Sequence, residues 1–110
     1  MTKTEWSKRE KEIARRVFEA AYRRECMAAL EVVRKMAAEI DDPTDLWRLS
    51  EYLTKTRDEV DEKYDYRYSV LPFVFARLIH EEWIKPEDLA GLSEEKLEKI
   101  RQIAEFWTRS

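Results

Sequence analysis

The sequence predicts an all-α protein: a bundle of four to five helices with a long N-terminal helix, assembled as a two-fold homodimer. Its 110 residues are 44% hydrophobic and 41% charged, a balance typical of helices that carry many charges on their solvated faces. A single Gly and three Pro are fewer turn residues than a sheet-rich fold needs. The length suits one helical domain over residues 1–110, with ends that we expect to be disordered or frayed at about 1–6 and 108–110.

A first helix is expected from Lys8 to Ile40, because no helix-breaking residue interrupts this stretch. At about 1.5 Å per residue it would be roughly 50 Å long, whereas a compact domain of this size is roughly 34 Å across. The overhanging part would expose apolar surface that a second copy can cover, with Leu30 as a candidate residue in the dimer interface. The main apolar row, at steps of three and four, is Phe18, Tyr22, Cys26, Ala29, Val33, Met36 and Ile40.

A second helix is expected to follow Asp42, whose side chain can cap it, with Pro43 at its first position, and to end at about Lys63. Its predicted core stripe is Leu46, Leu49, Leu53, Val60 and Tyr64. The residues off this stripe that are candidates for a surface site are Trp47, Ser50, Glu51, Lys55 and Arg57. Trp and Arg are enriched in binding hot spots, although Trp47 could equally fill the core and Arg57 could pair with an acid of its own helix.

A third helix is expected after a short turn, with Ser69 as its cap and Pro72 in its first turn, where amide groups have no helical partner anyway. Residues 73–79 are apolar nearly all round, which predicts the most buried element of the fold. The apolar pattern continues through Ile84 to a break at Pro86.

One further turn of helix is expected from Glu87 to Ala90, ended by Gly91 in a left-handed conformation. Ser93 can then cap the last helix. The predicted apolar stripe of that helix is Leu97, Ile100, Ala104 and Trp107.

The charge pattern favours solvated helix faces over a nucleic-acid or membrane partner. The net charge is −3, and the first 35 residues hold ten Lys or Arg against six Glu. Because acids interleave with these bases, the first helix carries no uninterrupted basic stripe. The longest apolar run, residues 70–76, is far too short to span a bilayer. With no apolar leader at the N-terminus, we expect a cytoplasmic protein without membrane insertion.

The residues that usually carry chemistry are scarce. His80 is the only histidine and Cys26 the only cysteine, too few for a zinc site, and no Gly-rich phosphate loop is present. We expect Cys26 to be a small core-facing thiol and His80 an ordinary surface residue. The chain is therefore predicted not to be an enzyme, with no catalytic residues, no metal site and no cofactor.

The strings Asp45-Leu46-Trp47-Arg48-Leu49, Arg57-Asp58-Glu59 and Phe73-Val74-Phe75-Ala76 resemble those of the fluorescence recovery protein family of cyanobacteria. The similarity runs from Trp6 to about Ile100. It is densest in Asp45-Leu46-Trp47-Arg48-Leu49 and in the block from Lys63 to Ala76. Two positions depart from the family's usual residues, with Ser50 in place of His and Glu51 in place of Asp.

The resemblance implies an all-helical homodimer that binds photoactivated orange carotenoid protein, chiefly through the C-terminal domain of that partner. Binding would speed the partner's return to its resting orange form and restore phycobilisome fluorescence, peripheral to thylakoids if the host is cyanobacterial. The partner-binding residues would be Trp47, Ser50, Glu51, Arg57, Phe73 and Lys99. Leu30 and Leu46 would lie in the dimer interface.

Two alternatives remain open on the sequence. The first is a fluorescence-recovery-like adaptor or chaperone-like dimer that serves a different bacterial protein. The second is a small nucleic-acid-binding regulator that uses the basic first helix.

Overall fold

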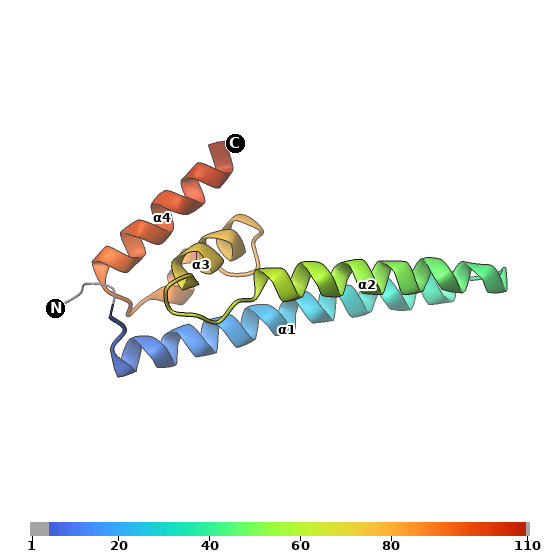
Figure 1. Cartoon of the computed structure of the whole chain (residues 1–110), viewed down its shortest axis with the longest axis horizontal. Helices are drawn as coiled ribbons and strands as arrows, with labels where there is room; N and C mark the ends of the chain where they lie inside the picture. The colour runs from blue at the N-terminus through green and yellow to red at the C-terminus, as the bar shows by residue number, and fades with distance from the viewer. Residues whose placement is uncertain (1–4, 110) are drawn as a thin grey trace.

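The computed structural model describes residues 5–109, and these residues form an elongated all-α molecule with extents of 61 × 31 × 21 Å (Figure 1). Among them no strand occurs, only an isolated bridge between Ala90 and Leu92. The elements in order are α1 (Lys8–Ala38), the 3-10 turn η1 (Pro43–Asp45), α2 (Leu46–Lys63), α3 (Leu71–His80), the 3-10 turn η2 (Pro86–Leu89) and α4 (Glu94–Arg109).

The molecule has two parts, which we call the head and the arm. The arm, residues 22–63, is an antiparallel hairpin of the second half of α1 with α2, and it extends away from the rest of the chain (Figure 1). The head, residues 5–21 and 64–109, packs α3, η2 and α4 around the first half of α1. Every residue from Tyr22 to Glu59 is at least partly exposed, so the enclosed core lies in the head.

The long α1 starts with a reciprocal cap. The Ser7 hydroxyl accepts a hydrogen bond from the Glu10 amide at 3.1 Å, and the Glu10 carboxylate accepts one from the Ser7 amide at 3.0 Å. This arrangement satisfies two amide groups that the first turn leaves without helical partners. The helix ends at Ala38, two residues before the end expected from the sequence.

The cap at Asp42 is confirmed. Its carboxylate accepts hydrogen bonds from the Thr44 amide at 3.0 Å and from the Thr44 hydroxyl at 2.9 Å. The capped segment is the turn η1, which leads directly into α2 at Leu46. The hydrogen bonds of the Asp42 side chain therefore fix the turn at the tip of the arm.

The predicted boundaries of α3 were wrong at both ends. Ser69 does not cap it; α3 instead follows a backbone turn in which the Arg67 carbonyl accepts from the amides of residues 70 and 71. The helix ends at His80 rather than near Pro86 because Glu82 adopts a left-handed conformation with φ of 65°. The Trp83 amide then donates to the Leu78 carbonyl, which is the hydrogen bond of a Schellman cap. This reversal allows Ile84 to reach the core.

The head core is apolar and closed. Its largest fully buried side chains are Phe75, Leu71, Leu78, Leu89 and Ile100. The first half of α1 adds Ile13, Ala14, Val17 and Ala21.

The predicted left-handed Gly91 is confirmed, with φ of 107°. A Cβ atom at this position would lie 2.5 Å from the Ile13 side chain, so glycine also permits η2 to approach α1 closely. Ser93 caps α4, because its hydroxyl accepts from the Lys96 amide at 3.3 Å.

A linker, residues 64–68, packs against α1 through alternate side chains. The tyrosines at positions 64, 66 and 68 pack toward α1, while Asp65 and Arg67 form an ion pair with each other. The Arg15 guanidinium lies 4.2 Å from the Tyr66 ring centroid. Successive ring centroids are 4.8–5.6 Å apart in the order Trp6, Tyr68, Tyr66, Phe18, Tyr64 and Tyr22.

Two expectations about burial need correction. Cys26 is exposed rather than core-facing, because the head elements cover α1 only as far as Ala21. Leu46 and Leu53 are exposed rather than part of a core stripe, because the arm is only two helices thick. Of the ends expected to fray, residues 1–4 and 110 lie outside the described residues, while Trp6 packs against Tyr68 and α4 continues to Arg109.

Candidate docking surface

The residues singled out on α2 lie on the solvent side of the arm. Trp47 is 66% exposed, so it does not fill the core. Ser50 and Glu51 are also exposed and line a shallow depression of about 460 Å³. The remaining residues of that depression are Thr54, Lys55, Asp58, Glu59 and Glu62.

Arg57 extends from the same helix with its side chain 82% exposed. Its guanidinium lies 3.7 Å from the Asp61 carboxylate, one helical turn further on. An exposed pair at this distance contributes little to stability, typically about 0–1 kcal/mol. Arg57 can therefore exchange Asp61 for a carboxylate of another protein at small cost. We call Trp47, Ser50, Glu51 and Arg57 the arm patch.

Phe73 and Lys99 lie together in the head. Phe73 on α3 is 51% exposed, and the Lys99 ammonium on α4 lies 5.4 Å from the centroid of its ring. A cation beside an aromatic face is a combination suited to binding, because the ring offers apolar area and the ammonium offers charge. We call this pair the head patch.

The structure does not bring the two patches together within one chain. Trp47 lies in the first turn of α2, at the far tip of the arm, whereas α3 and α4 lie in the head (Figure 1). A partner that touches both patches must be large, or the two patches must come from different copies of the chain.

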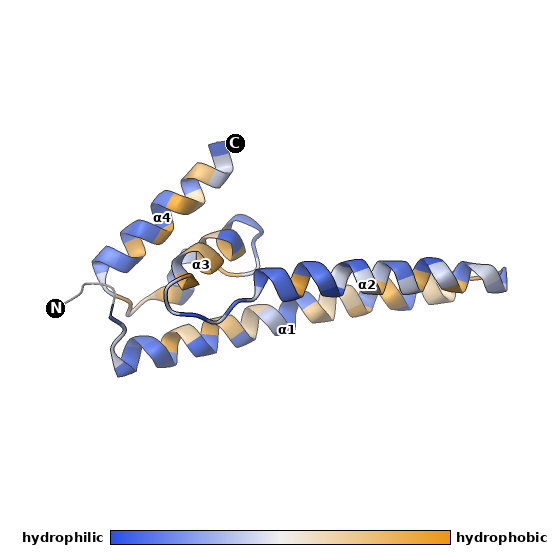
Figure 2. Cartoon of the chain, viewed as in Figure 1, coloured by the Kyte–Doolittle hydropathy of each residue, from blue (hydrophilic) through white to orange (hydrophobic). Residues whose placement is uncertain are grey.

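The arm exposes apolar side chains well beyond these patches. The two residues expected in a dimer interface are both exposed, Leu30 at 38% and Leu46 at 51%. Figure 2 shows apolar residues along both helices of the arm. The other large exposed apolar side chains there are Tyr22, Met27, Val32 and Leu53. A surface of this kind is typical of an interaction site.

A cluster of buried charges joins the arm to the head. The Lys63 side chain, only 4% exposed, donates hydrogen bonds to Glu25 at 2.7 Å and to Glu81 at 2.5 Å. Arg77 donates to the same Glu81 carboxylate at 2.9 Å. Burial opposes ionisation of Glu81, but these two cations outweigh it and hold the pKa of Glu81 below its usual value. The cluster ties α1, α2 and α3 together where the arm begins.

A second buried ion pair holds α4 against the start of α1. The Lys96 ammonium lies 3.3 Å from the Glu10 carboxylate and donates to the Glu5 carbonyl at 2.8 Å. Glu10 also accepts from the Ser93 amide at 2.8 Å. Burial opposes its ionisation, but the amides of Ser7 and Ser93 and the charge of Lys96 hold the pKa of Glu10 below its usual value.

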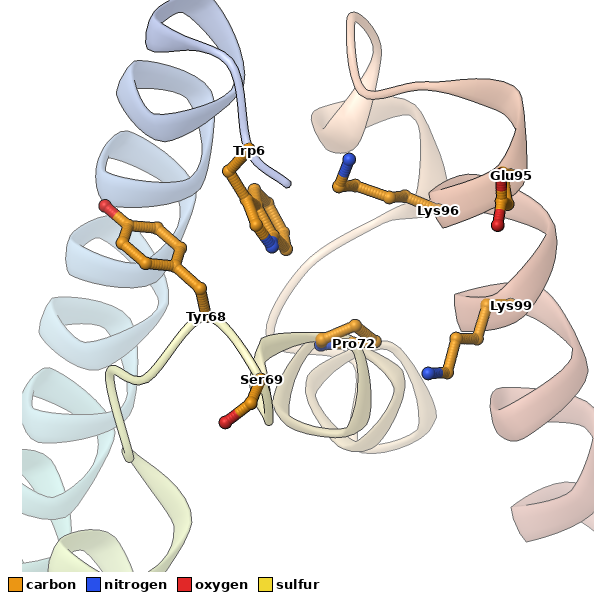
Figure 3. Close-up of a pocket in the computed structure, with 7 residues that line it drawn as sticks. All are labelled: Trp6, Tyr68, Ser69, Pro72, Glu95, Lys96 and Lys99. Carbon is orange, nitrogen blue, oxygen red and sulfur yellow. The ribbon is translucent and has the colours of Figure 1, made fainter. Parts of the chain in front are cut away.

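Beside this pair lies a cleft of about 420 Å³ between α4 and the segment before α1 (Figure 3). Its lining residues are Trp6, Tyr68, Ser69, Pro72, Glu95, Lys96 and Lys99. The cleft therefore shares Lys99 with the head patch. Sequence reasoning missed it, because its walls come from three segments that are far apart in the chain, at residues 6, 68–72 and 95–99.

Residues 5–109 contain no group of three or more His, Cys, Asp or Glu side chains placed to hold a metal ion. No helix among the same residues is long and apolar enough to cross a bilayer. The feature of these residues best suited to contact with another protein is the exposed apolar surface of the arm.

Comparison with known proteins identifies the family of this chain. Residues 6–104 match the family described as photoprotection regulator fluorescence recovery protein. The chain belongs to this family. It is 40% identical over 99 residues to the fluorescence recovery protein of Synechocystis sp. PCC 6803, a match that covers 90% of this chain and 91% of that protein.

Solved structures of fluorescence recovery proteins share the fold. The protein from Fremyella diplosiphon is 44% identical and superposes with a TM-score of 0.86, over 92% of this chain and 99% of that one. The Synechocystis protein is 40% identical with a TM-score of 0.87, over the same shares of the two chains. The four helices thus reproduce an arrangement seen in other members of the family.

Proposed function

We propose that this chain binds photoactivated orange carotenoid protein, chiefly through the C-terminal domain of that partner, and accelerates its return to the resting form. Phycobilisome fluorescence would recover as a result. Membership of a photoprotection regulator family supports this proposal, together with a surface built for protein contact. The observation that carries it is the arm patch, in which a largely exposed Trp47 shares a helix with the weakly paired Arg57.

The proposed mechanism is differential binding. A protein speeds a conformational relaxation only if it binds the transition state for that relaxation more tightly than the starting state. Trp47 would bury apolar area against the partner, and Arg57 would hold one of its carboxylates. Because the arm patch and the head patch are far apart, they can contact two regions of the partner and stabilise the arrangement in which those regions approach each other.

We further propose that two copies of the chain associate through their arms. The arm lacks an enclosed core, and its exposed apolar side chains include Leu30 and Leu46. A two-fold interface would cover this surface on both copies at once. It would also place the arm patch of each copy on a shared scaffold.

The substitution Arg57→Glu tests the proposed docking residues. We expect the variant to lose most of the acceleration, about tenfold or more, because it would set a carboxylate against the acid that Arg57 binds. The measurement is the dark recovery of photoactivated orange carotenoid protein, timed with and without the chain. The matched control is Arg48→Glu, an exposed arginine half a helical circumference away from Arg57 on α2.

Sedimentation should show the same assembly for Arg57→Glu as for the parent chain. Recovery at the parental rate with Arg57→Glu would show that the arm patch is not the docking site. If the parent chain itself has no effect on recovery, the partner is a different protein, and the alternative of an adaptor for another client becomes the better account.

A further inference from the structure

The cleft beside Trp6 combines an apolar wall with one lysine that forms no ion pair with the described residues. Figure 3 shows the Trp6 ring on one side of the cleft and Pro72 at its base. The ring is held by two neighbours that also line the cleft, because its centroid lies 5.5 Å from that of Tyr68 and 5.1 Å from the Lys96 ammonium. A preformed wall of this kind can bind an apolar side chain without first becoming ordered.

The two lysines of the cleft differ in what they can offer a ligand. Lys96 is buried, and its charge is already matched by Glu10. Lys99 is exposed and makes no ion pair with any residue between 5 and 109. Its ammonium points into the cleft near Pro72 (Figure 3). The cleft therefore offers one positive charge to an incoming anion.

The negative charge of Glu95 restricts which anions the cleft can accept. Glu95 also lines the cleft, on α4. A run of several acids would place like charges near its carboxylate, which is unfavourable. One carboxylate next to an apolar side chain fits both the charge and the walls. The volume of about 420 Å³ is within the range of ligand-binding clefts.

We propose that this cleft binds a short segment of the protein partner in which a single Asp or Glu stands beside an apolar residue. The carboxylate pairs with Lys99, and the apolar side chain packs between Trp6 and Pro72. The proposal rests on the proposed function, because Lys99 is shared with the head patch and the cleft continues that docking surface inward. It adds two contact residues that neither patch includes, Trp6 and Pro72.

The first test uses peptides and does not depend on the identity of the partner. The full-length chain is titrated with acetyl-Phe-Asp-Leu amide and with its Asn counterpart, while the indole N–H signal of Trp6 is followed by NMR and assigned with Trp6→Phe. We expect a saturable shift of that signal, at least about fivefold weaker binding of the Asn peptide, and loss of the difference in Lys99→Ala. No saturable shift, or equal binding of the two peptides, would overturn the proposal.

The second test uses photoactivated orange carotenoid protein and the whole chain. Ser69 lines the cleft, is exposed and makes no hydrogen bond with the residues described, so the large side chain of Ser69→Trp can obstruct the cleft without removing a structural contact. We expect Ser69→Trp and Lys99→Glu each to weaken binding about tenfold. Lys85→Glu, which reverses the charge of an exposed lysine of the head outside the cleft, should bind as the parent does.

The two proposals fail in different ways. If Arg57→Glu abolishes binding while Ser69→Trp and Lys99→Glu bind as the parent does, the proposed function stands and the cleft is not used. If the parent chain does not bind the carotenoid protein at all, the proposed function fails, and the peptide titration alone decides whether the cleft accepts an acidic segment.

Discussion

The head and the arm use the same helix, α1, for different purposes. In the head, Ile13, Val17 and Ala21 lie in a closed core. In the arm, the same helical periodicity leads to residues such as Met27 and Leu30 that remain largely exposed. Periodicity specifies an apolar face, but what covers that face depends on the elements that reach it. The head completes its own core, whereas the arm has apolar surface left for another chain.

The largest expected effect is the loss of a head side chain. Phe75 is fully buried, so Phe75→Ala should lower the free energy of unfolding by about 4 kcal/mol through lost apolar burial and a new cavity. Guanidinium denaturation followed by circular dichroism measures this. Phe106→Ala, at a position 72% exposed, should cost less than about 0.5 kcal/mol. Equal losses would mean that the head core is not where the structure places it.

A smaller loss is expected at the junction between the two parts. Lys63→Met removes the cation between Glu25 and Glu81, and leaving these carboxylates without it should cost about 3 kcal/mol at pH 7. The cost should shrink toward pH 5, because Glu81 loses the neighbour that lowers its pKa and can then take up a proton. Urea denaturation at both pH values measures the difference, with the exposed Lys55→Met as control. A pH-independent cost would argue against a charge effect.

A substitution on the surface of the arm should change dimerisation rather than the fold. Leu46 is half exposed in the single chain, so Leu46→Glu should leave the helical content unchanged. In a dimer interface the new carboxylate would lose water, and a cost of about 2.7 kcal/mol would weaken dimerisation about a hundredfold. Sedimentation across a range of concentrations measures this, with Phe106→Glu as a charge control in the head. Unchanged sedimentation would remove the arm from the interface.

The smallest effect concerns acid sensitivity in the head. The folded pKa of Glu10 is lowered, so its contribution to stability is present above the unfolded value of about 4.3 and is lost as the pH falls through the folded value. Glu10→Gln should therefore cost about 1 kcal/mol at pH 7, and the difference from the parent should close below about pH 4. Thermal unfolding as a function of pH measures the two curves. Curves that stay parallel down to pH 3 would contradict the assignment.

The sequence predicted those parts of the fold that depend on neighbouring residues. The caps at Asp42 and Ser93 and the left-handed Gly91 are local features, and all three are present. The end of α3 at His80 was missed because it depends on Glu82 adopting a left-handed conformation so that Ile84 can enter the core. Nothing near Glu82 in the sequence indicates this reversal.

The candidate site was predictable to a similar extent. Spacing placed Trp47 and Arg57 on adjoining parts of α2, but only the structure shows that Trp47 is exposed. Phe73 and Lys99 came from the family resemblance alone, because their contact joins two helices. The burial of Lys63 was not predictable, since its acidic partners lie 18 and 38 residues away in the chain.

The alternating tyrosines of the linker place a constraint on its length. Tyr64, Tyr66 and Tyr68 contact side chains of α1, while Asp65 and Arg67 between them pair with each other. One inserted residue would turn a tyrosine outward and bring Asp65 or Arg67 against apolar rings. Relatives that lengthen this connection while keeping the ring contacts must therefore do so two residues at a time, or reorganise the whole junction.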